Sequence, residues 1–379
     1  MRLYKPVKLS DYCEITSSKR IYAKEYIDSG VPFYRGKEVV ASFSGGNVSD
    51  PLFISENKFE EIKHRFGAPE KGDLLLTSVG TIGVPYRVTG EFDFYFKDGN
   101  LTWFRKLNGV DQNFLYYWLQ SPQGKAELSK CTIGAAQPAY TIERLKEISI
   151  ELPPENIQRD IASVIADYDI ALKNNRRRIQ LLEESARLLY QEWFVHLRFP
   201  GHEQVKITDG VPEGWEKKPL KQIATLNYGK ALKAEVRVPG PFPVYGSSGE
   251  VGSHEKPLVK GPGIVVGRKG NVGSVYWVNT DFYPIDTVYF ISAEESCLFL
   301  YHALQNVQFI NTDVAVPGLN RDMAYSREIL IPDDKNYQCF LSEVVPIQEQ
   351  INKLQDYNIK LAQARDLLLP KLMSGELTV

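Results

Sequence analysis

The polar side chains best suited to bind another molecule lie beside tyrosine or glycine residues in turn-like segments of this sequence. Arginine and asparagine can each form two parallel hydrogen bonds, with the edge of guanine or adenine respectively, whereas lysine mainly contacts phosphate. An exposed, solvated residue is the alternative interpretation for any single member of the set. The candidates are Arg35, Lys37, Arg65, Ser78, Thr81, Gln137 and Tyr140 in the first part of the chain, and Tyr245, Ser247, Ser248, Arg268, Lys269, Asn271, Asn320 and Arg321 in the later part.

Motifs of common enzymes are missing from the sequence. It has no G-x-x-x-x-G-K-[ST] loop for nucleotide phosphates, no H-E-x-x-H zinc motif and no Asn-Pro-Pro-aromatic tetrapeptide of an amino-methyltransferase. Gly267, Gly270 and Gly273 are spaced by three, but no helix clearly follows them. We interpret the last two, with their counterparts Gly80 and Gly83, as turn glycines of a shared hairpin. No catalytic residue, cofactor or metal site is therefore expected on this chain.

The overall charge does not point to any particular partner. The chain has 45 Lys and Arg against 47 Asp and Glu, a net charge of −2. A nucleic-acid-binding domain usually shows a basic surface, so such a surface would have to come from the placement of charges or from a basic partner protein. No apolar run reaches the roughly 18 residues of a membrane span, and the cysteines form no C-x-x-C pair. We therefore expect a cytoplasmic protein with reduced thiols that does not associate with membranes.

The sequence repeats itself in blocks with constant offsets. Leu9, Pro32 and Tyr34 match Leu220, Pro243 and Tyr245 at an offset of 211. Gly80, Gly83, Tyr86, Val88 and Phe92 match Gly270, Gly273, Tyr276, Val278 and Phe282 at an offset of 190, and Pro138, Ile150, Leu152 and Pro153 match Pro317, Ile329, Ile331 and Pro332 at 179. These blocks predict two homologous units with a pseudo-two-fold relation, which suits a partner such as duplex DNA. Arg35 corresponds to Gly246, so matched backbones would carry different side chains.

Two long amphipathic helices are predicted, one after each unit. The segment from Glu155 to about Leu197 contains neither Pro nor Gly, which gives a helix of about 43 residues or roughly 65 Å. A second helical region follows from about Tyr337, and we expect Pro346 to kink or restart it. The apolar stripes of these helices include Ile161, Tyr168, Asn175, Ile179, Leu182, Leu189 and Trp193, and then Ile351, Leu354, Leu361 and Leu368.

The two stripes are expected to pack against each other as a coiled coil. The repeat favours an antiparallel pairing, although the periodicity alone would equally allow parallel packing. Asn175 on the stripe either fixes the register, as a buried Asn does in coiled coils, or is simply exposed. The fold class is therefore α+β, with homologous mixed α/β domains at 1–153 and 201–331 and long helices at 154–200 and 332–379. Leu115–Leu128 is the best helix candidate inside the first domain.

Three strings in the sequence resemble a known family. They are LLYQEWFVHLRFPGHE from Leu188 to Glu203, VPEGWE at 211–216 and ARDLLLPKLMSGEL from Ala364. With them the whole chain resembles the specificity subunit of type I restriction–modification enzymes. The resemblance implies that residues 1–153 and 201–331 are target recognition domains, each reading one half of a bipartite site in double-stranded DNA.

The resemblance also implies which partners this chain has. The long helices would separate the two recognition domains and dock modification subunits, two of which are expected, and two restriction subunits would join later. S-adenosylmethionine, ATP and magnesium are then expected on the partner subunits of this adenine methyltransferase and ATP-dependent endonuclease. Two other classes stay open: a stand-alone enzyme, which the missing motifs disfavour, and an orphan or scaffold-type specificity protein that binds partner proteins without an active restriction complex.

Overall fold

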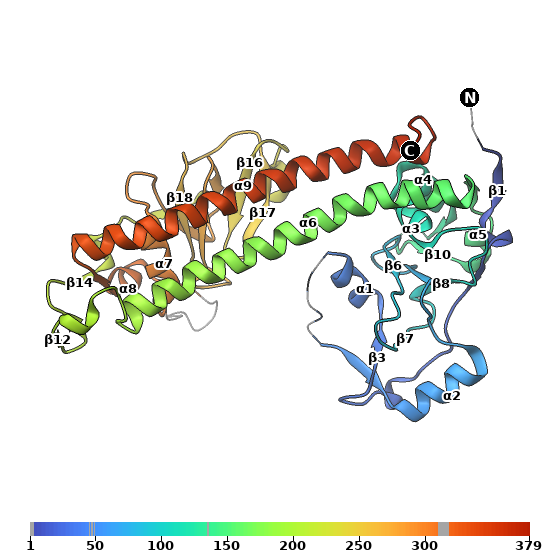
Figure 1. Ribbon diagram of the computed structural model, residues 1–379, viewed down its shortest axis with the longest axis horizontal. Coiled ribbons are helices and arrows are strands. Elements are labelled where there is room, and N and C mark those ends of the chain that lie inside the picture. Colours follow the sequence, from blue (N-terminus) through green and yellow to red (C-terminus); the bar gives the residue numbers. More distant parts are fainter. Residues whose placement is uncertain (1–3, 45, 47, 49, 135, 310–317) are drawn as a thin grey trace. The chain divides into compact units, whose positions relative to one another are not determined.

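The chain forms two compact units, each with its own core. A computed structural model describes residues 4–44, 46, 48, 50–134, 136–309 and 318–379 (Figure 1). Unit 1 comprises Met1–Lys173 and Asn358–Val379, and unit 2 comprises Asn174–Tyr357. Both long helices continue from one unit into the other, because the divisions fall inside them.

Unit 1 is built on small sheets that pair distant parts of the chain. A four-stranded antiparallel sheet has the order β2 (Glu14–Thr16), β8 (Leu101–Arg105), β5 (Leu74–Thr77) and β6 (Pro85–Arg87). A three-stranded sheet has the order β4 (Leu52–Ile54), β3 (Val31–Tyr34) and β7 (Tyr95–Phe96), in which β3 and β7 are parallel. The strand β1 (Pro6–Lys8) pairs with β11 (Ser149–Glu151), and β9 (Thr132–Ile133) pairs with β10 (Ala139–Tyr140).

Five short helices complete unit 1, and polar side chains cap most of them. They are α1 (Gly36–Phe43), α2 (Glu56–Phe66), α3 (Gln112–Gln120), α4 (Pro122–Cys131) and α5 (Ile142–Lys146). The prediction of a single helix over Leu115–Leu128 is wrong, because the helix is interrupted at Ser121. The Ser121 side chain accepts a hydrogen bond from the Gly124 N–H, and Pro122 begins the second helix, where a missing N–H costs nothing.

Unit 2 repeats the sheets of unit 1 in the same order. Its four-stranded sheet runs β15 (Asn227–Tyr228), β21 (Val288–Ile291), β18 (Gly263–Gly267) and β19 (Val275–Val278). Its three-stranded sheet runs β17 (Gly249–His254), β16 (Phe242–Gly246) and β20 (Tyr283–Pro284), and β16 and β20 are again parallel. The strand β14 (Glu216–Pro219) pairs with β22 (Glu328–Ile331), a β12–β13 hairpin (Ile207–Thr208 and Val211–Pro212) precedes them, and the short helices are α7 (Leu298–Asn306) and α8 (Arg321–Tyr325).

Equivalent aromatic residues fill the same place in the two cores, with one correction to the sequence match. The Tyr34 ring lies 4.7 Å from that of Phe94, and the Tyr245 ring lies 6.2 Å from that of Phe282. The parallel strand pairs show that Phe94, and not Phe92, corresponds to Phe282, since each lies two residues before the partner of the tyrosine. Phe94 is buried, whereas Phe92 is 46% exposed. The offset of 190 therefore ends before β7, because unit 1 has two more residues between Val88 and β7 than unit 2 has between Val278 and β20.

Helix α6 agrees with its prediction, and helix α9 is more regular than its proline content indicates. Helix α6 spans Glu155–Tyr190 and ends in a π-helical turn over Gln191–Val195, close to the predicted range. Helix α9 is one continuous helix over Asp334–Met373, so the expected kink or restart at Pro346 is wrong (Figure 1). Proline removes the hydrogen bond to the carbonyl four residues earlier. That carbonyl belongs to Ser342, which is exposed, so water can replace the lost donor.

Within each unit α6 and α9 pack together and run antiparallel. In unit 1 the first half of α6 meets the last half of α9, and the Arg365 guanidinium lies 2.8 Å from the Asp169 carboxylate. In unit 2 the end of α6 meets the start of α9, where the rings of Tyr190 and Phe340 are 5.8 Å apart. Because both helices are continuous, these contacts confirm the antiparallel pairing.

The residues of the two apolar stripes are buried to different degrees. Ile161, Trp193, Ile351 and Leu354 are buried, and the others are half-buried: Tyr168, Asn175, Ile179, Leu182, Leu189, Leu361 and Leu368. Part of the stripe also packs on the cores of the two units. Ile161 of α6 belongs to the core of unit 1 together with Leu372 of α9. The Trp193 ring lies in the core of unit 2, 5.9 Å from that of Phe340.

Candidate nucleic-acid interface

One hairpin loop has the same backbone conformation in both units. It joins β5 to β6 in unit 1 and β18 to β19 in unit 2. The four glycines of the two loops, Gly80, Gly83, Gly270 and Gly273, have φ between 79° and 82°, where L-residues with a side chain are strained. The Gly83 N–H donates to the Thr77 carbonyl at 2.8 Å, and the Gly273 N–H donates to the Gly267 carbonyl at 2.9 Å. The glycines are therefore turn residues, as the sequence predicts.

Ser78 and Arg268 occupy the same backbone position in these two loops. The Ser78 carbonyl accepts from the Tyr140 N–H at 3.0 Å, and the Arg268 carbonyl accepts from the Leu319 N–H at 2.8 Å. Each loop is thereby joined to the segment just before the last short helix of its unit. The two units differ here only in side chain: a small hydroxyl in unit 1 and a long cation in unit 2.

In unit 2, two arginines stack on one exposed tyrosine. The Arg268 guanidinium carbon lies 5.0 Å from the centre of the Tyr228 ring, and that of Arg321 lies 5.1 Å from the same centre. Arg268 also lies 5.7 Å from the ring of Tyr289 and donates from Nη1 to the Asp286 carbonyl at 3.1 Å. Burial raises the pKa of Tyr289 to about 12, so its hydroxyl stays protonated and donates to the Leu319 carbonyl at 2.9 Å. The stacking fixes two cations at one place on the surface.

The other candidates of unit 2 divide into loop residues and core residues. Lys269, Asn271 and Ser248 are exposed, and the first two share the Arg268 loop. The Asn320 side chain caps α8 by accepting from the Asp322 N–H at 2.8 Å, which places Arg321 at the start of that helix. Ser247 is buried, and its carbonyl accepts from the Ser274 hydroxyl at 2.6 Å. Tyr245 packs in the core, where burial raises its pKa to about 12.

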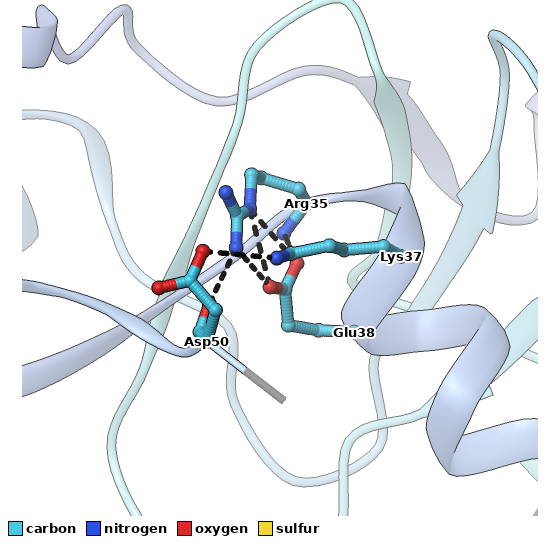
Figure 2. Close-up of polar contacts among 4 residues, drawn as sticks. All are labelled: Arg35, Lys37, Glu38 and Asp50. Atoms are coloured by element: carbon cyan, nitrogen blue, oxygen red, sulfur yellow. Dashed lines mark hydrogen bonds and ion pairs between the residues drawn. The ribbon is translucent and has the colours of Figure 1, made fainter. Parts of the chain in front are cut away.

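In unit 1, Arg35, Lys37 and Thr81 line one surface pocket of about 540 Å³, together with Gly80 of the β5–β6 loop and residues of α1. Two carboxylates already engage the cations of this pocket, as Figure 2 shows. The Arg35 Nη2 lies 2.6 Å from Oε1 of Glu38, a side chain only 1% exposed, and donates to the Asp50 carbonyl at 2.8 Å. The Lys37 ammonium lies 3.3 Å from the Asp50 carboxylate. The Glu38 carboxylate also accepts from the Arg35 backbone N–H at 2.6 Å, so it is the Glu38 side chain that caps the start of α1.

The remaining candidates of unit 1 lie in three different surroundings. Ser78 is buried beneath the loop, and its hydroxyl shares a hydrogen bond of 2.7 Å with Thr102. Gln137 is exposed and Tyr140 half-buried in the β9–β10 hairpin beside the Ser78 loop. Arg65 is elsewhere, on α2, where it contacts Glu61 at 3.3 Å and lines a larger pocket of about 840 Å³. The structure therefore brings most loop candidates together within each unit but leaves Arg65 apart.

Within the described part of the chain, no group of three or more His, Cys, Asp or Glu side chains could hold a metal ion. Nor is any helix among those residues long and apolar enough to cross a membrane.

Comparison with known proteins identifies the family. A sequence model described as "Type I restriction modification DNA specificity domain" matches residues 1–184 and again 212–361. The chain belongs to this family. Its members are the non-catalytic DNA-recognition subunits of type I restriction–modification systems.

Individual relatives agree with this assignment. The type I restriction enzyme MjaIX specificity subunit of Methanocaldococcus jannaschii is 26% identical over 410 residues, covering 98% of this chain and 93% of that protein. A putative type I restriction enzyme specificity subunit of Haemophilus influenzae is 29% identical over 190 residues, 49% of this chain and 46% of that protein. The crystal structure of a type I restriction–modification system S subunit from M. genitalium has a similar fold, with a TM-score of 0.59 at 17% identity over 98% of this chain and 96% of that one.

Two features of this specificity subunit were not predicted from the sequence. Tyr228 was not among the candidates, although it stands in an Asn-Tyr-Gly-Lys segment that combines an aromatic residue with turn and basic residues. The apolar side chains on the outer faces of the long helices were also not singled out. They include Ile170, Leu181 and Leu188 of α6 and Tyr357 and Leu367 of α9, all exposed.

Proposed function

We propose that residues 1–153 and 201–331 are two target recognition domains, each of which reads one half of a bipartite site in double-stranded DNA. Sequence is read where side chains reach base edges in a groove, while other contacts fix the position of the protein on the duplex. The loop and pocket residues of each unit supply side chains for base contacts and for positioning contacts. In unit 1 these are Thr81 and Lys37; in unit 2 they are Arg268, Lys269 and Asn271.

The observation that carries this proposal is the pair of equivalent hairpin loops with different side chains. The same hydrogen bonds hold the backbone at Ser78 and at Arg268. A common scaffold with exchanged side chains is what two readers of different sequences need, because function depends on the side chains that a fold presents.

We further propose that α6 and α9 dock two modification subunits. Exposed apolar residues on a helix are ordinary when isolated, but a set of them favours a protein interface. Ile170 and Leu367 lie on helix segments of unit 1, and Leu181, Leu188 and Tyr357 lie on those of unit 2. One such set in each unit supports one modification subunit per unit.

The chemistry of the complex would then belong to the partners, in the cytoplasm. S-adenosylmethionine would bind the modification subunits, and ATP and magnesium would serve the complex once two restriction subunits have joined. The residues described above provide this chain with DNA and protein contacts, and none of the proposed roles requires a cofactor held by it.

A domain exchange tests the division of reading between the units. Residues 1–153 are replaced by the corresponding segment of another family member, and modified bases are mapped across the DNA of cells that also express the modification subunits. We expect one half of the target to change and the other to persist. The reciprocal exchange of 201–331 serves as the matched control and should change only the other half.

Two results would contradict the proposal. If a single exchange altered both halves, the units would not read independently. If the chain assembled with modification subunits but never directed methylation, it would be a scaffold-type specificity protein.

A further inference from the structure

We propose that Arg268 and Arg321 read guanines in the half-site of unit 2, and that Tyr228 positions both guanidiniums for this task. The inference rests on the proposed function and specifies which bases one of the two units recognises. Arginine forms two parallel hydrogen bonds with O6 and N7 of guanine in the major groove, the commonest specific contact between protein and DNA. For this role both guanidiniums must be accessible, close together and held in place.

Both guanidiniums are available for a base. Among the described residues, the Arg268 guanidinium donates to the Asp286 carbonyl and lies against the rings of Tyr228 and Tyr289. Arg321 is exposed at the start of α8 and stacks on Tyr228 and Tyr325. Neither forms an ion pair with a carboxylate of the described residues, whereas Arg35 in unit 1 is neutralised by Glu38.

The two arginines are close enough to act on neighbouring base pairs. Their guanidinium carbons lie 5.0 and 5.1 Å from the same ring centre. They are therefore at most about 10 Å apart, which is about three base-pair steps at 3.4 Å each. Both contacts fall within one half-site of ordinary length.

Tyr228 is the element that holds the pair in place. An arginine side chain has many rotamers, and fixing it only on binding would cost affinity and selectivity. Stacking on an aromatic face restricts the guanidinium plane before DNA arrives and leaves its N–H groups free at the edge. Tyr228 is 49% exposed, and its backbone is fixed by pairing with Tyr289 in the four-stranded sheet. Tyr228 is thus a positioning residue and not itself a base-reading one.

Unit 1 has no such cluster at the corresponding positions. Arg268 corresponds to Ser78, and Tyr289 corresponds to Thr102, whose hydroxyls bond to each other in the interior. By the offset of 179, Arg321 corresponds to Ile142 at the start of α5. The guanine contacts of this kind therefore belong to the half-site of unit 2 alone.

Single substitutions in the complete complex test the inference. Arg268→Gln and Arg321→Gln are expressed with the modification subunits, and the modified target is mapped. Glutamine suits adenine instead of guanine. We expect each variant to lose preference for guanine at one position of one half-site by about 10- to 100-fold, with the other half-site unchanged. The two variants should affect positions no more than about three steps apart.

Matched variants distinguish a loss of base recognition from a loss of correct folding. Lys260→Gln removes an exposed charge just before β18 begins, whereas Arg268 directly follows the end of that strand. The Lys260→Gln variant should leave the DNA target unchanged. Tyr228→Leu should relax both guanine positions, and Tyr228→Phe, which keeps the ring, should restore them. A merely structural tyrosine would change the amount of modified DNA but not its sequence.

Binding assays with purified complexes test the inference even when a variant abolishes methylation. In these assays, the affinity is measured for duplexes in which each base pair of the target is replaced in turn. Loss of the penalty at one G·C pair supports the inference. Equal weakening on every duplex, with the salt slope reduced by about one, would mean phosphate contacts and would overturn it. Unchanged targets in both arginine variants would also overturn it, while a domain exchange that still changes one half-site would leave the proposed function intact.

Discussion

Arg35 and Arg268 each follow a strand directly, yet the structure uses their guanidiniums in opposite ways. Arg35 is paired with the buried carboxylate of Glu38 and holds the start of α1. Arg268 lies against the rings of Tyr228 and Tyr289 and forms no ion pair with a carboxylate of the described residues. At the scale of single residues, the partner and not the residue type decides whether an arginine supports the fold or can contact DNA.

Arg35→Ala is therefore expected to loosen α1. Glu38 would lose the cation that neutralises it while remaining buried, which costs about 1–3 kcal/mol. Amide hydrogen exchange of α1 in the full chain should show the corresponding loss of protection. Arg268→Ala is the matched control and should change exchange in its unit by less than about 0.5 kcal/mol. Unchanged exchange in α1 would mean that the pairing of Arg35 with Glu38 does not support this helix.

His302 predicts how the stability of unit 2 depends on pH. It is buried beside Tyr190 and Phe340, and burial lowers its pKa to about 4. In the unfolded chain a histidine titrates near 6.5. Between these values the unfolded state binds more protons, so the free energy of unfolding falls as the pH decreases from about 6.5 to about 4 and is unaffected above that range. The full effect is about 3 kcal/mol.

Hydrogen exchange of α7 at pH 7.5, 6 and 5 measures this dependence. His302→Gln removes the titrating group and keeps a polar side chain next to Gln305, so the variant should lose this part of the slope. If the wild type and the variant showed the same pH dependence, another group would be responsible.

At the scale of elements, the sequence predicts what periodic patterns and repeated blocks can encode. The segment without Pro or Gly from Glu155 to about Leu197 locates α6 within a few residues, and the repeated glycines locate both hairpin loops. The continuity of α9 across Pro346 was not predictable, because it depends on whether one carbonyl, that of Ser342, can reach water.

Contacts between distant elements account for the other differences. Phe92 satisfies the repeat in the sequence, but only strand pairing reveals that Phe94 occupies the equivalent core position. Arg35 and Arg268 look alike as candidates, but Glu38 pairs with Arg35 from three residues along the chain, whereas only the fold places Tyr228 beside Arg268. Local patterns thus define the elements, while the functional state of a side chain depends on its three-dimensional neighbours.

The ion pair between α6 and α9 in unit 1 should contribute measurably to their pairing. Arg365 lies 2.8 Å from Asp169, both about 30% exposed, and the Tyr117 hydroxyl donates to the same carboxylate at 2.8 Å. A double-mutant cycle with Asp169→Asn and Arg365→Gln should give a coupling free energy of about 0.5–1.5 kcal/mol. The exposed pair Lys8–Glu147 of the same unit is the matched control and should show no measurable coupling, because solvent screens it. Equal coupling in the two cycles would show that the shared carboxylate adds nothing.

At the scale of the whole molecule, two continuous helices join two repeated recognition units. If these helices set the spacing between the half-sites, a change in their length must change the DNA target. One heptad inserted in α6 between Asn175 and Leu182, with a matching heptad in α9, keeps the apolar stripe in phase. It adds about 10 Å at 1.5 Å per residue, or about three base-pair steps of DNA. We expect the preferred spacer to lengthen while both half-site sequences stay the same, which mapping of modified bases would detect. An insertion of two residues in α6 alone is the control, because at 3.6 residues per turn it rotates the following part of the stripe by about 200°, away from α9, and should abolish activity instead of shifting the spacer. A folded, active heptad variant with an unchanged spacer would mean that bending of the DNA, and not the helix length, determines the distance between the half-sites.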